Sequence, residues 1–397
     1  MVAIQDKSTR AWIKNLLPLT MGGFSIGMTE FLMMGVLPDV ANSLSISIPT
    51  AGYLIAIYAF GVVIGAPLMI ALSKNYPPKK ILATLMLLFA IFNSLFSIAP
   101  TFLLLLFARF MSGLPHGAFF GVGAVVATQL ATPGKGASSV AIMFAGLTLA
   151  NILGVPIGTF IGHHVSWRIA YFIVALLGLL TLASIIKWLP DLILANTPNF
   201  RQSLKIFKDI EIWLIIGISA IGTGGLFAWI SYIAPLMTDV ASFSDNMVTL
   251  IMMLAGIGMA VGNLLGGCVA DRWSPLLITG LLLFIMIGCL LAVALVAEHQ
   301  SYALVMTFVT GAVAFAVVPA MQMLMIHAAK GSEMLASSMV QASANMGNTL
   351  GAYLGGLPIA AGFGYTSPEY VGMGLAFIGL ILCLLIRLTR TSILVEQ

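Results

Sequence analysis

Long apolar runs, each of about 20 residues or more, alternate with short polar segments from one end of the chain to the other. A helix of about 20 residues crosses a hydrocarbon core of about 30 Å, so each run predicts one membrane-spanning helix. Transmembrane barrels use alternating segments of about 10 residues instead, which this sequence lacks. The pattern predicts an all-α membrane protein with twelve transmembrane helices, at residues 15–37, 50–72, 81–99, 102–129, 137–162, 168–188, 211–237, 247–269, 276–297, 301–327, 335–361 and 370–388.

The composition agrees with this interpretation. Hydrophobic residues make up 60% of the chain and charged residues 8%, and the mean hydropathy is +1.09. Average soluble chains are roughly a quarter charged, so this chain cannot cover a water-exposed surface and has the lipid bilayer as a partner. The first apolar run is long and lacks a small-residue cleavage site, which predicts a span rather than a removable signal peptide.

The basic residues are distributed unevenly between the two sides of the predicted helices. If the N-terminus is cytoplasmic, all of the 17 Lys and Arg lie at cytoplasmic ends or loops except Arg109 and Arg168. This positive-inside bias predicts a multi-pass protein of the inner or plasma membrane with both termini in the cytoplasm. The net charge of +4 therefore reflects topology, and we infer no nucleic-acid partner from it.

The chain consists of two similar halves. "NILGVPIG" begins at Asn151 and "NTLGAYLG" begins at Asn348, 197 residues later, with the Asn, the Leu and both glycines in register. A polar stretch between the sixth and seventh spans separates the halves. We expect two pseudo-symmetric six-helix bundles, at 1–188 and 211–397, joined by a cytoplasmic linker at 189–210. Repeats of this kind are typical of transporters with a binding site near the midplane.

The loop after the eighth span gives the first specific resemblance. It reads "GGCVADRWSPL" and resembles the G-x-L-A-D-R-x-G signature of the major facilitator superfamily, with Asp271 and Arg272 as its acid and base. Such an acid can pair with a base or with a helix N-terminus and so latch one conformation. The alternative is a charged loop that only ends a span. The matching first-half loop departs from the signature, with Lys74 and Asn75 at the two positions.

The fourth and fifth spans extend this resemblance. "ARFMSG" in the fourth is similar to the R-x-x-x-G element of the superfamily, and "ANILGVPIGTFIG" in the fifth resembles the Gly/Pro-rich element of its twelve-span drug:proton antiporter branch. Gly154, Pro156 and Gly158 would let the fifth helix bend, although glycines also serve plain helix packing. Together with "GMTEFLMMGVLPDVA" and "FAWISYIAPLM", these stretches resemble the AraJ-type, arabinose-efflux-permease-like branch. The resemblance implies the major facilitator fold and secondary transport.

Charged residues inside a span are expensive and usually face a bundle interior or a water-filled cavity. Glu30 and Arg109 each lie about eight residues inside an outer helix end, which places both roughly 12 Å deep. In the fold that the resemblance implies, the first and fourth spans both line the central cavity. We therefore expect Glu30 and Arg109 to be near neighbours, with Glu30 as the proton-coupling carboxylate and Arg109 tuning it. The alternative is a static pair that only joins two helices. His116, deeper in the fourth span, is a candidate for relaying a proton or for binding a hydroxylated substrate. The alternative is a hydrogen-bonded packing residue.

Polar and aromatic side chains elsewhere in the spans are candidates for the substrate cavity. Each of them can equally serve as an interhelical hydrogen-bond partner. Trp229 offers a face for stacking on a sugar or an apolar drug. The candidates are Asn151, Thr223, Trp229, Ser231, Tyr232, Gln322 and Asn345.

No pattern of catalytic, cofactor-binding or metal-ligating residues is evident, and "GKG" near Lys135 is too short for a phosphate-binding loop. We therefore expect no enzyme activity and no cofactor. The sequence predicts a monomeric secondary transporter that exports a small molecule, a sugar or a drug-like compound, by proton antiport with alternating access. The alternatives are a sugar or metabolite uptake symporter or facilitator, and a membrane sensor that does not transport.

Overall fold

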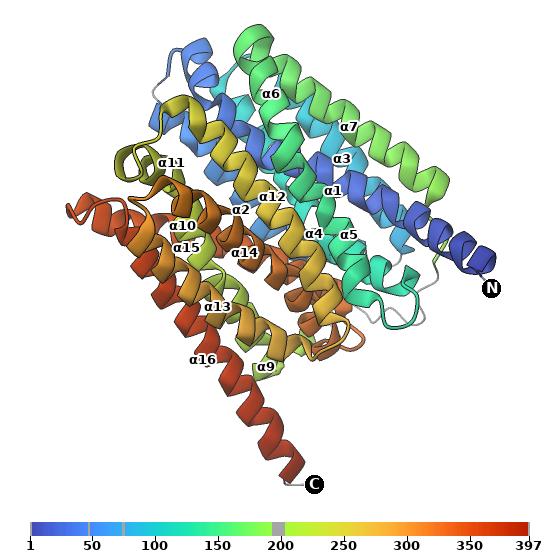
Figure 1. Ribbon diagram of the computed structural model, residues 1–397. Coiled ribbons are helices and arrows are strands. Elements are labelled where there is room, and N and C mark those ends of the chain that lie inside the picture. The colour runs from blue at the N-terminus through green and yellow to red at the C-terminus, as the bar shows by residue number, and fades with distance from the viewer. Residues whose placement is uncertain (1, 47, 74–75, 193–202, 396–397) are drawn as a thin grey trace. The chain divides into compact units, whose positions relative to one another are not determined.

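The computed structural model describes residues 2–46, 48–73, 76–192 and 203–395 (Figure 1). Contacts divide the chain into two compact units, which we treat separately. The first unit is Met1–Ser203 with Gly331–Ala342, and the second unit is Leu204–Lys330 with Ser343–Gln397. The predicted loop residues Lys74 and Asn75, and residues 193–202 of the predicted linker, lie outside the described residues.

The first unit is built from helices of the N-terminal half. Within it, α2 packs along α4, α3 packs along α7, and α1 packs along both α5 and α7. A π-helical turn, Ala150–Gly154, joins α5 to α6. The helices are α1 (Val2–Leu44), α2 (Ile48–Leu72), α3 (Pro78–Ile98), α4 (Phe102–Leu130), α5 (Gly136–Leu149), α6 (Val155–Ile161) and α7 (Trp167–Trp188).

The second unit repeats this arrangement with its own helices. Here α12 packs along α14, and α13 packs along α14 and α16. The segment that contains α9, α10 and α11 is interrupted by π-helical turns at Ile218–Gly222 and Leu236–Val240. The helices are α9 (Ile210–Gly217), α10 (Gly224–Ser231), α11 (Ile233–Pro235), α12 (Asp245–Ala270), α13 (Pro275–Val296), α14 (Gln300–Ala328), α15 (Glu333–Ala360) and α16 (Ser367–Val395). The residues of α15 up to Ala342 belong to the first unit.

Ten helical stretches of the described residues are long and apolar enough to cross a membrane, and one of them, Gly136–Trp188, has 53 residues. That length is about 80 Å, enough for two spans. The backbone becomes extended at Ser166, directly before α7, so this stretch holds the predicted fifth and sixth spans. The helix α15 is not among the ten because polar residues lower its hydropathy, namely Ser337, Ser338, Gln341, Ser343 and Asn345. Including it gives the twelve expected spans.

The helix ends have identifiable causes. Both α3 and α13 begin with a proline, Pro78 and Pro275, whose missing N–H is not needed in a first turn. The Arg168 guanidinium donates from Nη1 to the Ser97 and Ala99 carbonyl oxygens at 3.1 and 2.7 Å. A cation at the C-terminus of a helix satisfies its free carbonyls and interacts favourably with its dipole. This contact explains why Arg168 departs from the distribution of the other basic residues.

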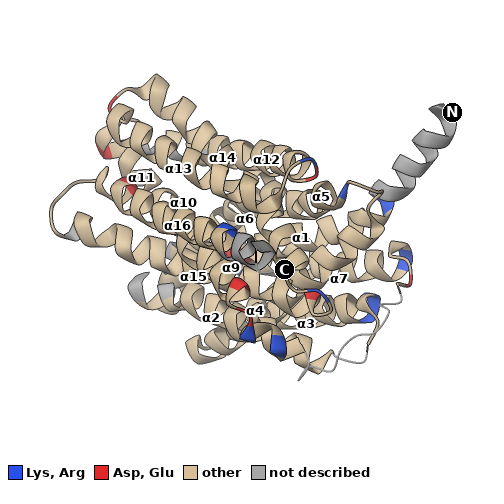
Figure 2. Cartoon of the chain, turned by 90° about the horizontal axis from the view of Figure 1, so that it is seen from below, with Lys and Arg blue, Asp and Glu red and all other residues tan. Residues whose placement is uncertain are grey.

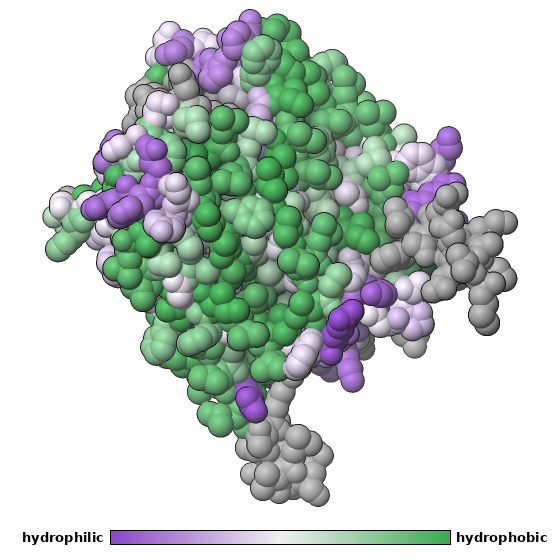
Figure 3. Space-filling model, viewed as in Figure 1, coloured by the Kyte–Doolittle hydropathy of each residue, from purple (hydrophilic) through white to green (hydrophobic). Residues whose placement is uncertain are grey.

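Charged residues gather at helix ends and in loops, and the middles of the helices are largely without them (Figure 2). Apolar side chains cover most of the face shown in Figure 3, with hydrophilic residues toward its margins. Many large apolar side chains are exposed in the middle of helices, including Phe60, Phe284 and Phe377. An apolar exterior with charged ends fits a protein whose solvent is the lipid bilayer.

Candidate functional site

The clearest polar cluster in a membrane-spanning region of the first unit centres on Arg109 of α4. The Arg109 side chain is fully buried. Its Nε donates to the Leu54 carbonyl oxygen of α2 at 3.2 Å, and its Nη1 donates to the Thr29 carbonyl and hydroxyl oxygens of α1 at 3.0 and 3.2 Å. Charge-assisted hydrogen bonds of this kind are stronger than neutral ones. One guanidinium therefore ties α1, α2 and α4 together.

Aromatic rings surround the same guanidinium. Its carbon lies 4.3 Å from the ring centroid of Tyr58, 5.6 Å from that of Phe96 and 5.7 Å from that of Tyr171. Ring faces within about 6 Å attract a cation electrostatically, so they partly replace the hydration that burial removes. Hydrogen bonds and aromatic rings thus hold the positive charge in place. No acidic residue of the described part of the chain lies close enough to form an ion pair with it.

A second set of hydrogen bonds extends from Thr29. Its hydroxyl donates to Asn93 Oδ1 of α3 at 2.6 Å, and Asn93 Nδ2 donates to the Phe89 carbonyl oxygen at 2.8 Å. The Tyr171 hydroxyl of α7 donates to the Thr29 carbonyl oxygen at 3.4 Å. Thr29 therefore connects the guanidinium to α3 and α7, and all of these polar groups are buried.

His116 joins the cluster through Tyr58. The Tyr58 hydroxyl and His116 Nδ1 lie 3.1 Å apart, and the imidazole is 2% exposed. On its other side the imidazole contacts the Phe120 ring, with centroids 5.3 Å apart. A path of contacts thus runs from Arg109 over the Tyr58 ring to His116, which places two of the predicted residues in one cluster.

Glu30 lies next to this cluster without bonding to it. It directly follows Thr29 on α1 and is only partly buried, and it forms no hydrogen bond or ion pair with any described residue. Arg109 Nη2 is buried and also has no hydrogen-bond partner in the described part of the chain. Arg109 therefore lies at the level of Thr29, the residue before Glu30, but the structure shows no hydrogen bond or ion pair between Glu30 and Arg109.

The predicted cavity residues of the second unit differ widely in environment. Trp229 is 1% exposed and Gln322 is fully buried, whereas Ser231 is exposed. The Thr223 hydroxyl donates to the Ser219 carbonyl oxygen at 2.6 Å, and the Tyr232 hydroxyl donates to the Ala352 carbonyl oxygen of α15 at 2.7 Å. These two hydroxyls bond to backbone of their own unit.

The two predicted asparagines lie on different helices. Asn345 on α15 is 8% exposed. Asn151 is partly buried in the π-helical turn between α5 and α6. That turn ends at Gly154, and Pro156 lies in the first turn of α6. A π-helical turn leaves the regular hydrogen-bond pattern of an α-helix, so the predicted bending element coincides with a local irregularity.

The glycines of this element also bring α6 close to α1. A Cβ atom at Gly154 would collide with the Met28 side chain, and one at Gly158 would lie 2.8 Å from Leu32 Cδ1. The predicted latch residues are found at the turn after α12, with Asp271 partly buried and Arg272 exposed.

Sequence reasoning missed four residues of the Arg109 cluster: Thr29, Tyr58, Asn93 and Tyr171. Asn93 has a usable signal, because it is the only amide in the apolar helix α3 and a buried amide needs partners. The tyrosines carry no such signal, since they resemble other aromatic residues of the spans. Their role depends on which way each side chain points.

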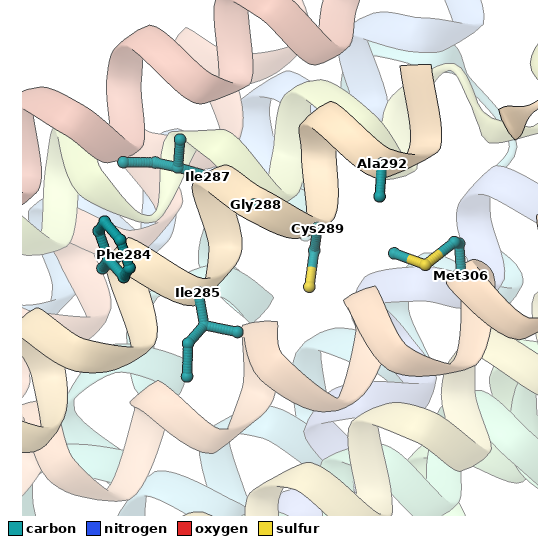
Figure 4. A pocket seen from close by; sticks show the side chains of 7 residues that line it. All are labelled: Phe284, Ile285, Ile287, Gly288, Cys289, Ala292 and Met306. Carbon is teal, nitrogen blue, oxygen red and sulfur yellow. The ribbon is translucent and has the colours of Figure 1, made fainter. Parts of the chain in front are cut away.

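One cavity of about 450 Å³ in the second unit is apolar (Figure 4). A ligand site normally has a few convergent polar groups that fix the orientation of its ligand. This cavity has none, so it lacks the chemistry expected of a substrate site. It is lined by Phe284, Ile285, Ile287, Gly288, Cys289, Ala292 and Met306.

Comparisons with known proteins place the chain in a family. The model of the Major Facilitator Superfamily matches residues 19–334 and 227–395. The chain is 39% identical to the putative transporter AraJ of Escherichia coli over 92% of both chains. It is 38% identical to the inner membrane transport protein YdhP of Escherichia coli over 92% of this chain and 94% of YdhP. It is 27% identical to a chloramphenicol resistance protein of Streptomyces lividans over 93% and 95%.

Solved structures share the fold. A variant of the Escherichia coli fucose:proton symporter FucP superposes with a TM-score of 0.76 at 15% identity, over 94% of this chain and 98% of FucP. The proton:xylose symporter XylE superposes with a TM-score of 0.74 at 16% identity, over 94% and 95%. At such low identity these likenesses establish the fold alone. This multi-pass membrane protein therefore belongs to the major facilitator superfamily, as an AraJ-type transporter with the twelve-helix fold of that superfamily.

Proposed function

We propose that the chain exports a small molecule by proton antiport, with Glu30 as the proton-binding carboxylate and Arg109 as the group that responds to its charge. The observation that carries this proposal is that two polar groups at one depth have no hydrogen-bond partner among the described residues. Arg109 Nη2 has no hydrogen-bond partner among the described residues, and the Glu30 carboxylate has none either. The two residues are linked through Thr29, the neighbour of Glu30 in the chain.

The chemistry follows from the two protonation states of Glu30. An ionised Glu30 attracts the guanidinium and offers a strong acceptor to Nη2, whereas a protonated Glu30 carries no charge and is a weaker acceptor. Because Arg109 also holds Leu54 of α2 and Thr29 of α1, a change at Glu30 acts on the helices that the guanidinium joins. Protonation thus biases the arrangement of α1, α2 and α4, which is what coupling of a proton to alternating access requires.

The names of the relatives support export more than uptake. One relative over nearly the whole chain is a chloramphenicol resistance protein, and AraJ and YdhP are named as transporters. We propose a drug-like compound or a sugar as the substrate class. We also propose a location in the inner membrane, with both termini in the cytoplasm and a monomer as the working unit. His116 is proposed to relay the proton through Tyr58, to which it is hydrogen-bonded.

Two further elements are proposed to serve the conformational change. The π-helical turn before Gly154 and the proline at 156 make the α5–α6 segment a candidate for bending. Asp271 and Arg272, at the turn after α12, are proposed as the latch of one conformation.

The test is flux in proteoliposomes that contain the purified protein and an internal pH-sensitive dye. An imposed pH gradient is combined with a panel of monosaccharides and of antibiotics that includes chloramphenicol. We expect at least one compound to move against the proton flow, and we expect Glu30→Gln to keep counterflow exchange but lose the response to the gradient. Glu298→Gln, which changes an exposed carboxylate, is the matched control and retains both activities.

The outcomes separate the candidate functions. Movement of substrate in the same direction as the proton contradicts antiport and indicates a symporter. Gradient-driven flux that persists in Glu30→Gln contradicts the role of Glu30. Binding of a ligand without any flux indicates a sensor.

A further inference from the structure

Among the buried polar atoms of the second unit that have no hydrogen-bond partner in the described residues, one lies on α10 and one on α16, and neither has a part in the proposed coupling at Glu30. Trp229 of α10 is 1% exposed, and its indole N–H has no hydrogen-bond partner among the described residues. Glu369 in the first turn of α16 is also 1% exposed, and its Oε2 likewise has no partner there. An unpaired buried donor or acceptor is unfavourable, and more so when it is charged.

Helix packing places these two residues on the facing sides of α10 and α16, and the structure shows no hydrogen bond between them. Gly222, just before α10, and Gly225, in its first turn, both approach α16. A Cβ atom at Gly222 would lie 3.1 Å from Gly379 Cα, and one at Gly225 would lie 2.8 Å from the Gly372 carbonyl oxygen. Residues three and four apart share one helix face. Trp229 therefore continues the face of α10 that packs on α16.

A matching face lies on α16. Gly379 and Gly372 face α10, and Glu369 lies three residues before Gly372 on the same face. The two helices run antiparallel, because Gly222 meets Gly379 and Gly225 meets Gly372. Continuing that pairing by one turn brings Trp229 to the level of Glu369.

The internal repeat leads independently to the same pairing. Gly158 approaches Leu32 in the first unit, and Gly355 approaches Tyr232 in the second. If Leu32 corresponds to Tyr232, the same offset of 200 residues makes Trp229 the second-unit counterpart of Thr29.

The partner position follows from the outer helices of each unit. The rings of Phe96 and Tyr171 are in contact, with centroids 4.5 Å apart. In the second unit, Gly372 approaches Leu290, so Glu369, one turn earlier on α16, lies opposite Val293. Aligning the starts of α3 and α13, Pro78 with Pro275, makes Val293 the counterpart of Phe96. Glu369 therefore corresponds to Tyr171.

In the first unit these two positions are hydrogen-bonded. The Tyr171 hydroxyl donates to the Thr29 carbonyl oxygen at 3.4 Å. In the second unit the same two positions carry a donor that is never an acceptor, the Trp229 indole N–H, and a carboxyl group that can gain or lose a proton, Glu369. The repeat thus places a titratable group where the first unit has a fixed hydrogen bond.

We propose that Glu369 and Trp229 form a second proton-binding site, within the second unit, in which the ionised Glu369 carboxylate accepts the indole N–H of Trp229. A proton from the aqueous phase forms an O–H bond on the carboxylate, and the weaker acceptor then loosens the indole contact. The indole N–H keeps its own hydrogen throughout. The site goes beyond the proposed function, because its existence does not depend on the substrate or on Glu30.

The surroundings leave the carboxylate as the group that titrates. No basic residue occurs in α10 or α13, and the described structure shows no ion pair to Glu369. The described titratable side chains of α16, of the second-unit elements packed around it and of the adjoining loops are Glu211, Tyr232, Cys289, Glu298, His299, Tyr353, Tyr365, Tyr370, Cys383 and Arg387.

The position of α10 gives protonation a structural consequence. This helix has eight residues, a π-helical turn before it and a break at Tyr232 after it. A short segment that is irregular at both ends can move as a piece. Contact between Trp229 and Glu369 would hold that segment against α16, and protonation would release it.

The test is a pH titration of the carboxylic acid infrared band of the full-length protein in lipid, with no substrate present. We expect one titrating band that is lost in Glu369→Gln and retained in Glu30→Gln and Glu298→Gln. In Trp229→Phe the midpoint of this band should move to higher pH by about one unit, because the ionised form loses a hydrogen bond to a charged group.

A second measurement on the unaltered chain covers the case in which Trp229→Phe does not fold. The indole ¹⁵N–H resonance of Trp229 should shift with the same midpoint as the infrared band, and it should stop shifting in Glu369→Gln. The proposal is overturned if every titrating carboxyl band survives Glu369→Gln, or if the Trp229 resonance is independent of pH. Neither readout uses transport, so a failure here is distinct from a failure of the proton antiport proposal.

Discussion

The contact between α2 and α4 in the first unit and the contact between α12 and α14 in the second are built alike. In the first, Gly61 lies against the Phe110 carbonyl, and in the second, Gly258 lies against the Phe308 carbonyl, so closely that a Cβ atom at either glycine would collide. The glycines are 197 residues apart in the chain and the phenylalanines 198. The two units therefore use one packing scheme.

Their chemistry is different. At the position of Arg109 the second unit has Thr307, and at the position of Tyr58 it has Ala255. The Thr307 hydroxyl donates to the Ala303 carbonyl oxygen of its own helix at 2.8 Å and bonds to no other element in the described part of the chain. Glycine spacing thus determines how these helices pack, whereas at these positions the buried charge and its hydrogen bonds belong to the first unit alone.

The largest expected effect comes from placing the residue of the second unit into the first. Arg109→Thr removes three hydrogen bonds and the aromatic contacts, so we expect a loss of about 3 kcal/mol of unfolding free energy. Proton-driven flux should be lost as well. Thermal unfolding in detergent and proteoliposome flux measure the two effects. Thr307→Val is the control, and an equal loss in that variant would contradict the asymmetry.

The shared packing is tested with glycine substitutions in both units. Gly65→Ala and Gly262→Ala each place a Cβ against a backbone carbonyl, of Leu114 and Ala312 respectively. We expect both to lower stability by about 2 kcal/mol, with similar values because the contacts are alike. Gly288→Ala, where a Cβ meets nothing within 4 Å, should be close to neutral. If only one of the two packed glycines is sensitive, the units do not pack alike.

A smaller effect is expected at Asn93. When α3 and α13 are aligned at their first residues, Pro78 and Pro275, the counterpart of Asn93 is Leu290. The change Asn93→Leu therefore introduces the residue that the second unit has at this position. The change leaves the Thr29 hydroxyl without its acceptor and should lower stability by about 1.5 kcal/mol. The double variant with Thr29→Val should recover part of that loss. Additive losses in the double variant would show that the two side chains do not interact.

The smallest effect is expected from Tyr58→Phe. This change removes the hydroxyl that bonds to His116 but keeps the ring over the Arg109 guanidinium, so we expect a loss of about 1 kcal/mol. Tyr58→Leu removes the ring too and should lower stability further, because the cation–π contact is also lost. Equal values for the two variants, measured by thermal unfolding, would argue against a role for the ring.

The number and order of the spans could be predicted from the sequence, because apolar length fixes them locally. Several ends differ from the predicted ones: α1 begins at Val2 and not at residue 15, and π-helical turns interrupt the predicted span 211–237. Depth could be predicted as well: counting residues from the outer ends placed Arg109 level with Glu30, and Arg109 does contact Thr29. These quantities depend only on the rise of an α-helix and on the thickness of a membrane.

The partners of the buried charge could not be predicted in this way. Whether Arg109 reaches Glu30 or the neighbouring Thr29 depends on the rotation of α1 about its axis, which packing against several helices determines. The same holds for Tyr58 and Tyr171, which reach the guanidinium only because α2 and α7 present those faces. The Trp229 and Glu369 pair needed the packed glycines, which only the structure reveals.

The central claim is that Glu30 carries the proton that is exchanged for substrate. The most direct test is proton release into a weakly buffered detergent solution when the substrate identified by the flux panel is added to purified protein. We predict release from the unaltered protein and from Glu298→Gln, and none from Glu30→Gln although that variant still binds substrate. Equal proton release from Glu30→Gln would contradict the account.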